Sequence, residues 1–253
     1  MFQFLETERR GAVGIVRFMR PDQLNAMNRA FMDEIIAAFQ QMNQDPEVRV
    51  VVVTGSGRAF MAGADIKEYA AQTDEQFLAF QKRGMELYHQ AERSDKPYIA
   101  MVNGFALGGG FEIACACDMI VASEDAKFGL PEVHLGLVPG GGGTQRLIAK
   151  MGINRVKQLL FFGDQYSAQQ MMQWGIVNQV APADQLEEVC MNLAQKLTRR
   201  SPLALAQLKR LAYLSTCPID LDARMGQEAN AVFELFKTPQ AKEKIEKFIN
   251  KNK

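Results

Sequence analysis

The feature that most constrains the fold is a set of short apolar runs separated by helical stretches. Residues 48–54 are almost wholly β-branched, and residues 97–102 form a second apolar run that is opened by a proline. A third run spans residues 119–123. Runs of this length and composition predict buried strands. Their alternation with helical segments favours an α/β fold with a parallel sheet and right-handed βαβ crossovers.

Apolar residues at helical spacing predict helices over residues 28–43 and 73–94 in the first half of the chain. After Gly152 the strand signals fade, and helices are expected at residues 154–162, 167–174, 184–198, 202–215 and 220–236. Several of these segments open with Ser or Asp, which are favoured helix caps. The tail from Lys237 alternates in charge and is interpreted as a solvated helix face.

A triple glycine stands between a predicted strand and a predicted helix, in Leu-Gly-Gly-Gly-Phe-Glu at residues 107–112. Glycine permits unusual backbone angles and close approach of a ligand to the main chain. The first amides of the following helix lack internal partners and carry partial positive charge, so they could stabilise an oxyanion. A purely structural turn is the other interpretation, and the glycines alone leave both open.

A second junction has the same character. The strand at residues 48–54 runs into small residues and then into a helix expected from Asp65, so the amides of this loop could supply a second donor to one carbonyl oxygen. Glu112 follows the first glycine cluster, and Glu132 precedes the glycine-rich residues 139–143. Two carboxylates beside exposed amides suggest acid/base chemistry on a carbonyl compound.

With these motifs in this order, the chain resembles the enoyl-CoA hydratase/isomerase (crotonase) family over nearly all of its length. The motifs that carry the resemblance are residues 20–27, 62–68, 102–112, 118–122, 128–133 and 135–147. The resemblance implies an α/β fold in which ββα units repeat as a spiral. It further implies a core with the active site at residues 1–195 and a helical oligomerisation region at residues 196–253. In that family the C-terminal helices mediate trimers, which commonly pair into hexamers.

The implied activity is hydration of a 2-enoyl-CoA to a 3-hydroxyacyl-CoA, a lyase reaction of fatty acid or amino acid breakdown. It needs no metal or redox cofactor, and coenzyme A enters only as part of the thioester substrate. Glu112 matches the principal base and Glu132 the principal acid of the family. Ala64 and Gly109 match the two oxyanion-hole residues, and Gly140 matches an amide donor to the attacking water.

The same resemblance predicts where the substrate lies. The coenzyme A moiety is expected along a loop that includes Ala62, Asp65, Ile66 and Lys67, with Asn25 and Ala26 near the adenine. Lys67 is interpreted either as a phosphate partner or as a solvated residue. Tyr69 stands where the family often has Met, and Gly141 where Ala is frequent. Because tyrosine is stiffer and wider than methionine, we expect a preference for short acyl groups.

Composition excludes some classes of function. Formal net charge is zero and no basic stripe interleaved with aromatic residues occurs, which argues against nucleic-acid binding. No apolar run reaches the length of a membrane span. The four cysteines lack the spacing of a disulfide framework or a metal site, so a cytoplasmic protein with reduced thiols is expected. The two histidines are interpreted as structural or surface residues, with His134 expected on the same strand face as Glu132.

Three alternatives to simple hydration stay open. A Δ3,Δ2-enoyl-CoA isomerase of the same family usually manages with one of the two glutamates. A hydratase for a branched or carboxylated enoyl-CoA is compatible with the same motifs. A non-catalytic protein that binds CoA thioesters is the third.

Overall fold

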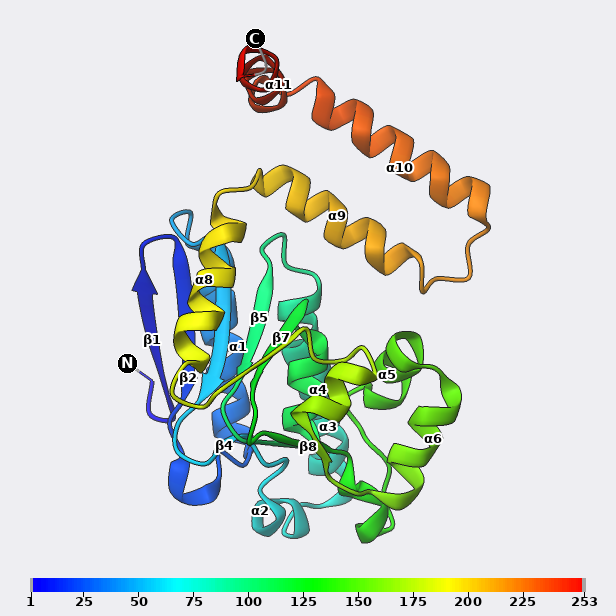
Figure 1. Ribbon diagram of the computed structural model, residues 1–253. Helices are drawn as coiled ribbons and strands as arrows, with labels where there is room; N and C mark the ends of the chain where they lie inside the picture. Colours follow the sequence, from blue (N-terminus) through cyan, green and yellow to red (C-terminus); the bar gives the residue numbers. More distant parts are fainter. Residues whose placement is uncertain (1, 252–253) are drawn as a thin grey trace.

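The computed structural model describes residues 2–251, and within them the main sheet has six strands in the order β1-β2-β3-β5-β7-β10 (Figure 1). These strands are β1 Leu5–Arg10, β2 Val13–Phe18, β3 Val50–Gly55, β5 Tyr98–Val102, β7 Met119–Ser123 and β10 Gln179–Ala181. β1 and β2 form an antiparallel pair, and every later neighbour from β2 to β10 is parallel. The expected parallel sheet is therefore confirmed.

A second, smaller sheet has the order β4-β6-β8-β9. Its strands are β4 Ala59–Met61, β6 Phe105–Leu107, β8 Lys127–Gly129 and β9 Tyr166–Ser167. β3, β5 and β7 of the main sheet are each followed by one short strand of this sheet and then by helical turns. This is the repeated ββα unit that the resemblance implied. The short strands were not predicted from the sequence, because runs of two or three residues have no periodicity of their own.

The β-branched run in β3 is buried on both faces of the main sheet. Val51 and Val53 belong to a core shared with α1 and α3, whereas Val50 and Val52 pack in a second core with α8. The side chains of a strand alternate between its two faces, so a strand covered on both sides has to be apolar throughout. Burial on both faces explains why the continuous β-branched run in β3 could be predicted as a strand from the sequence.

The predicted helical segments agree with helices of the structure to within a few residues, and α5 was not predicted from the sequence. Their bounds are α1 Arg29–Gln44, α2 Ile66–Ala70, α3 Asp74–Glu92, α4 Gly109–Ala116, α5 Gly143–Met151, α6 Ile153–Phe162, α7 Ala168–Gln173, α8 Leu186–Thr198, α9 Pro202–Leu214, α10 Leu221–Phe236 and α11 Pro239–Lys251. Ser167, Ser201 and Asp220 are caps whose side chains each accept a hydrogen bond from a backbone amide in the first turn, whereas Asp184 is not a cap, since α8 begins after Gln185 with no side-chain cap. Two 3₁₀ helices, η1 Pro21–Gln23 and η2 Pro131–Leu135, complete the described elements.

The last three helices extend away from the body of the fold (Figure 1). α9 is anchored by Lys209, whose Nζ donates to the Ala91 and Lys96 carbonyls and to an Asp118 carboxylate oxygen at 2.8 Å. α10 buries none of its residues and exposes a row of large apolar side chains, including Leu221, Met225, Val232, Phe233 and Phe236. No helix among residues 2–251 is both long and apolar enough to cross a membrane.

Candidate active site

A cavity of about 330 Å³ lies between α2, α3, the start of α4 and the segment from η2 to the glycine-rich loop. Its walls include eight residues predicted as site residues: Ala62, Ala64, Ile66, Tyr69, Gly109, Glu112, Glu132 and Gly140. Ala62 and Gly140, the first and last of these eight residues, are 78 positions apart in the sequence. The fold therefore gathers them at one place.

Four predicted substrate-binding residues do not line this cavity: Asn25, Ala26, Asp65 and Lys67. The Asn25 side chain is fully buried, and its Nδ2 donates to the carbonyls of Ser56 and Ala59 at 3.0 and 2.8 Å. Asp65 lies 3.3 Å from the guanidinium of Arg20. Asn25 and Asp65 therefore brace the loops that surround the site, and a role of these four residues in binding coenzyme A stays a prediction.

The triple glycine is a strand-to-helix turn, as predicted. Gly108 has φ +51°, a conformation that L side chains rarely adopt, and a Cβ there would lie 3.1 Å from Glu132 Oε1. A Cβ on Gly110 would lie 2.1 Å from the Met61 carbonyl oxygen, so α4 packs directly on β4. The turn places the first residues of α4 at the cavity wall.

The two predicted oxyanion-hole residues lie on adjacent loops. A Cβ on Gly108 would lie 3.5 Å from the Gly63 Cα, so the loop that carries Ala64 touches the turn that carries Gly109. Gly109 is the first residue of α4, and its amide therefore has no partner within the helix. Both residues line the cavity, and their role as an oxyanion hole stays a prediction.

Glu112 is held on one side by backbone amides. It lies in the first turn of α4, is 3% exposed, and its Oε1 accepts hydrogen bonds from the amides of Gly141 and Gly143, both at 2.8 Å. The Tyr88 hydroxyl lies 3.5 Å from Oε2. Burial raises the pKa of Glu112, and the two amides together with the charge of Arg146 oppose that rise. The amides favour the ionised carboxylate.

Glu132 has a contrasting environment. Burial is the main cause that raises its pKa to about 7, and the nearby charge of Glu112 adds to the rise. Its Oε2 is buried and has no hydrogen-bond partner within the described residues. A carboxyl group with this pKa carries a proton for much of the neutral range and can donate it.

The prediction for His134 was wrong in its geometry. Residues 131–135 form a 3₁₀ helix and not a strand, so the alternation that would put Glu132 and His134 on one face does not apply. The His134 Nε2 is 2.8 Å from the Phe162 carbonyl oxygen, and the side chain is exposed. His134 ties η2 to the end of α6.

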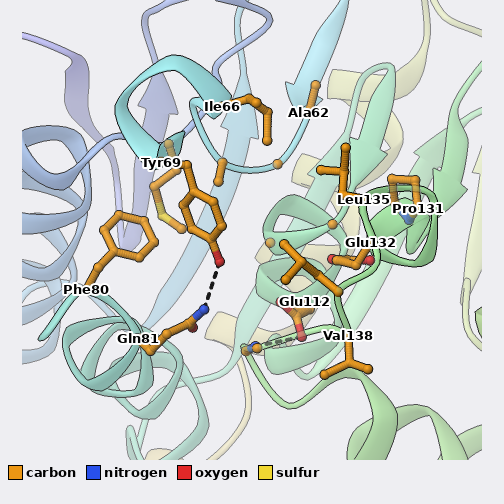
Figure 2. A pocket seen from close by; sticks show the side chains of 18 of the residues that line it. Ala62, Ile66, Tyr69, Phe80, Gln81, Glu112, Pro131, Glu132, Leu135 and Val138 are labelled. Carbon is orange, nitrogen blue, oxygen red and sulfur yellow. Dashed lines mark hydrogen bonds between the residues drawn. The ribbon is translucent and has the colours of Figure 1, made fainter. Parts of the chain in front are cut away.

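The wall opposite the glutamates is made by α2 and α3 (Figure 2). The Gln81 Nε2 donates to the Tyr69 hydroxyl at 2.9 Å, and the Tyr69 ring packs edge-on against Phe77 and Phe80. A Cβ on Gly140 would lie 2.5 Å from Gln81 Oε1, so the Gln81 carboxamide reaches across to the glycine-rich loop. This wall is partly polar.

Several residues that shape the site were not predicted from the sequence. Tyr88, Gln81, Gly141, Gly143 and Arg146 all contact a site residue or hold one in place. The glycine-rich loop and the Thr-Gln-Arg that follows it were recognised, but only Gly140 was assigned a role. A buried tyrosine on the apolar face of α3 was the one signal for Tyr88, since its hydroxyl needs a partner.

Comparisons with known proteins identify the family of this chain. The family model described as Enoyl-CoA hydratase/isomerase matches residues 8–253. A short-chain-enoyl-CoA hydratase of Clostridium acetobutylicum is 38% identical over 247 residues, covering 97% of this chain and 94% of that protein. The chain belongs to the enoyl-CoA hydratase/isomerase family.

Two further members of the enoyl-CoA hydratase/isomerase family are similar to this chain. A 2,3-dehydroadipyl-CoA hydratase of Escherichia coli is 37% identical, covering 98% of this chain and 96% of that protein. A crystal structure of an enoyl-CoA hydratase subunit from Geobacillus kaustophilus superimposes with a TM-score of 0.94 at 41% identity, covering 99% of this chain and 96% of that one. The crotonase-like spiral predicted from the motifs is therefore confirmed.

Residues 2–251 contain no group of three or more His, Cys, Asp or Glu side chains that could hold a metal ion. The polar side chains that line the cavity carry two carboxyls, two tyrosine hydroxyls, a carboxamide and an imidazole, and backbone amides lie beside them. These groups can move protons and stabilise an oxyanion.

Proposed function

We propose that the protein is an enoyl-CoA hydratase that adds water across the double bond of a 2-enoyl-CoA. The observation that carries the proposal is the pair of carboxyl groups on one cavity wall with different surroundings. Glu112 accepts two amide hydrogen bonds, and Glu132 has a pKa raised to about 7 with one oxygen that meets no partner among residues 2–251. Such a pair supplies a base and an acid at the same pH.

In the reaction, Glu112 takes a proton from water as the water oxygen bonds to the β-carbon. The electrons of the carbon–carbon double bond move toward the thioester, and negative charge develops on its oxygen. The amides of Ala64 and Gly109 stabilise that charge, an interaction worth about 3 kcal/mol per donor. Glu132 then gives its proton to the α-carbon, and a 3-hydroxyacyl-CoA results.

Addition of water is favoured over movement of the double bond. An isomerase moves a proton between two carbons of one substrate and can do so with one carboxyl group, whereas hydration divides the base and the acid between two groups. Both Glu112 and Glu132 line the cavity, which supports hydration. Retention of both groups also argues against a protein that merely binds CoA thioesters.

The substrate is proposed to carry a short acyl group. The Tyr69 and Gln81 pair limits the cavity on the side opposite the glutamates, and the relative from C. acetobutylicum is described as a short-chain-enoyl-CoA hydratase. At the cavity mouth, Leu135 and Val138 expose 59% and 78% of their surface. We assign these apolar side chains to contact with the pantetheine arm, and Lys67 with the adjoining loop to the phosphates.

A homotrimer, or a hexamer made of two trimers, is proposed for the assembly. The apolar row on α10 supports this proposal, because such a row is rarely left in water. Residues 196–253 are then the oligomerisation region and residues 1–195 the catalytic core. A cytoplasmic location is proposed because the cysteines of the described residues are unpaired and three of them are buried.

The function is tested by adding purified protein to crotonyl-CoA and following the loss of the conjugated enoyl-thioester absorbance. Steady loss of absorbance with formation of 3-hydroxybutyryl-CoA is the expected result. A protein that binds crotonyl-CoA but forms no hydrated product would support the non-catalytic alternative. Conversion of a 3-enoyl-CoA at a higher rate than hydration would support the isomerase.

A further inference from the structure

Arg146 lies behind the glycine-rich loop and makes contacts in three directions. Its Nε and Nη2 donate to the two carboxylate oxygens of Glu92 on α3, the latter at 2.9 Å, and its Nη1 donates to the Gly141 carbonyl oxygen. Its guanidinium also lies 5.1 Å from the ring centroid of Tyr88. The Arg146 and Glu92 side chains are only 13% and 14% exposed. A forked ion pair in this setting fixes the guanidinium in one position.

The carbonyl that Arg146 holds stands between the two amides that hold Glu112. Gly141 and Gly143 donate to Glu112 Oε1, and the Gly141 carbonyl lies between their nitrogens along the backbone. Gly142 has φ +89°, and a Cβ there would lie 2.4 Å from Arg146 Nη1. The loop therefore wraps closely around the guanidinium, so displacement of Arg146 would displace both amides.

Arg146 does not contact the substrate cavity in this arrangement. It lines a different cavity, of about 860 Å³, between α3, α5 and α9. Its influence on Glu112 runs through the loop and through Tyr88, whose hydroxyl lies 3.5 Å from Glu112 Oε2. An effect of Arg146 on turnover would thus be indirect.

We propose that Arg146, held in place by Glu92, is a positioning residue for the hydration reaction. It fixes the loop at residues 141–143 so that two amides hold Oε1 of Glu112, and Oε2, which faces the Tyr88 hydroxyl, takes the proton from water. The inference rests on the proposed function, because the proton transfer belongs to hydration. Arg146 also supplies a positive charge that favours the ionised form of Glu112.

The charge of Arg146 acts among other groups that interact with Glu112. Arg146 lowers the pKa of Glu112, and the hydrogen bond from Tyr88 acts in the same direction. The charge of Glu112 raises the pKa of its neighbours in turn, an effect found for Glu132 on η2, Tyr69 on α2, Tyr88 on α3 and Cys115 on α4. Since Glu112 has to be ionised to act as a base, loss of Arg146 should move the acid limb of the pH profile to higher pH.

Two substitutions separate position from charge. Arg146→Met removes the fork and the charge, so we expect kcat to fall about 10- to 100-fold, the range set by misplacement of a catalytic group by about 1 Å. KM should change by less than about 3-fold, since Arg146 does not touch the substrate. The acid limb of the pH profile should move to higher pH. Arg146→Lys keeps the charge but cannot hold Glu92 and the Gly141 carbonyl together. It should lower kcat while restoring the wild-type acid limb.

Arg83→Met is the matched control. Arg83 lies on α3, where it pairs with Asp33 at 2.7 Å and with Glu86, and its side chain is 39% exposed. Removal of this surface ion pair should leave kcat and the pH profile at wild-type values. A lower melting temperature in both Arg146 variants, with kcat and the acid limb unchanged, would show a merely structural role and overturn the proposal. If Arg146→Met does not fold, an unchanged kcat in Arg146→Lys overturns it.

Titration of Glu112 by carbon NMR on carboxyl-labelled protein separates this inference from the proposed function. The pKa of Glu112 should be higher in Arg146→Met than in the wild type, whether or not the wild type hydrates crotonyl-CoA. A protein that hydrates no enoyl-CoA would remove the proposed function while this shift stayed measurable. An unchanged pKa of Glu112 in a folded Arg146→Met protein contradicts the charge interaction on which the inference depends.

Discussion

The two glutamates of the cavity are the same residue type, yet their surroundings differ in the number of donors that each one meets. Glu112 is the more buried of the two, and its charge is offset by two amides at 2.8 Å and by Arg146. Glu132 has greater solvent exposure, but one of its oxygens is buried with no partner in the described part of the chain. Burial raises the pKa of both carboxyl groups, and the difference teaches that amide donors and a nearby cation oppose that rise at Glu112, whereas the charge of Glu112 adds to it at Glu132.

The largest expected effect is loss of either carboxyl group. Glu112→Gln and Glu132→Gln should each lower the rate of crotonyl-CoA hydration by about 100-fold or more, because general acid/base groups contribute about 10²- to 10⁴-fold. Steady-state kinetics of the purified variants, with circular dichroism as the control for folding, check this. Near-normal turnover in either folded variant would remove that residue from the mechanism.

A smaller loss of activity is expected when Glu132 is unchanged and the clamp on Glu112 is disturbed, meaning the two hydrogen bonds from the amides of Gly141 and Gly143. In this chain a Cβ on Gly141 would lie 2.2 Å from the Tyr88 hydroxyl and 2.5 Å from Glu112 Oε2, so Gly141→Ala has to push the carboxylate or the tyrosine aside, although Ala is frequent at this position in the family. We expect kcat to fall about 10-fold or more, as misplacement by a fraction of an ångström allows.

Gly84→Ala is the control for that substitution. A Cβ on Gly84 would have its nearest neighbours, Met32 and Tyr88, at 3.9 Å, an ordinary contact distance. This variant should keep wild-type kinetics. Equal activity in the Gly141 and Gly84 variants would mean that the clamp does not matter for turnover.

The raised pKa of Glu132 should also appear in stability. Its pKa is about 7 in the folded protein and near 4.5 when unfolded, so folding takes up a proton between these values and stability falls as pH rises through 7. Glu132→Gln removes this fall. The free energy of unfolding of Glu132→Gln relative to wild type should therefore increase by about 2 kcal/mol between pH 4.5 and pH 8, after allowance for partial solvent screening.

Urea unfolding at the two pH values measures that change. Glu86→Gln on the exposed side of α3 serves as the control for loss of a carboxylate. A stability difference between Glu132→Gln and wild type that is the same at both pH values would contradict the raised pKa.

The smallest expected effect concerns the opposite wall and acyl length. Tyr69→Met removes the hydroxyl that Gln81 binds and replaces a stiff ring by a flexible side chain. The ratio of activity on a ten-carbon to a four-carbon enoyl-CoA should rise a few fold, which is below the roughly 10- to 200-fold that one methylene in an apolar pocket can produce. A parent protein that already prefers ten carbons, or an unchanged ratio in the variant, would show that Tyr69 does not set the length.

The long strands and helices could be predicted because their signals are local. A continuous β-branched run such as residues 50–53 can be buried on both faces only as a strand, and the structure places it there. The short strands depend on partners elsewhere in the chain, as Ala59 pairs with Phe105, and no local pattern encodes that pairing. The 3₁₀ helix η2 was also not predicted from the sequence.

The candidate site divides in the same way. Resemblance located Glu112 and Glu132, and the fold brings both to one cavity. The Arg146 and Glu92 pair spans 54 residues and has no signature in sequence, because neither position differs from an ordinary surface charge until the helices pack. Asn25 belongs to a motif and was expected near the ligand, but its side chain donates hydrogen bonds to two backbone carbonyls.

The central claim is that Glu132 holds a proton near neutral pH while Glu112 is the ionised partner. Carbon NMR titration of carboxyl-labelled glutamates in the wild type, Glu112→Gln and Glu132→Gln tests it most directly. In the wild type we predict one carboxyl signal that titrates near pH 7 and is missing from the spectrum of Glu132→Gln. In Glu112→Gln the same signal should remain but titrate at a somewhat lower pKa, because the charge of Glu112 contributes to the raised pKa of Glu132. A wild-type spectrum with no carboxyl titrating above about pH 5.5, or one whose high-pKa signal vanishes only in Glu112→Gln, would contradict the account.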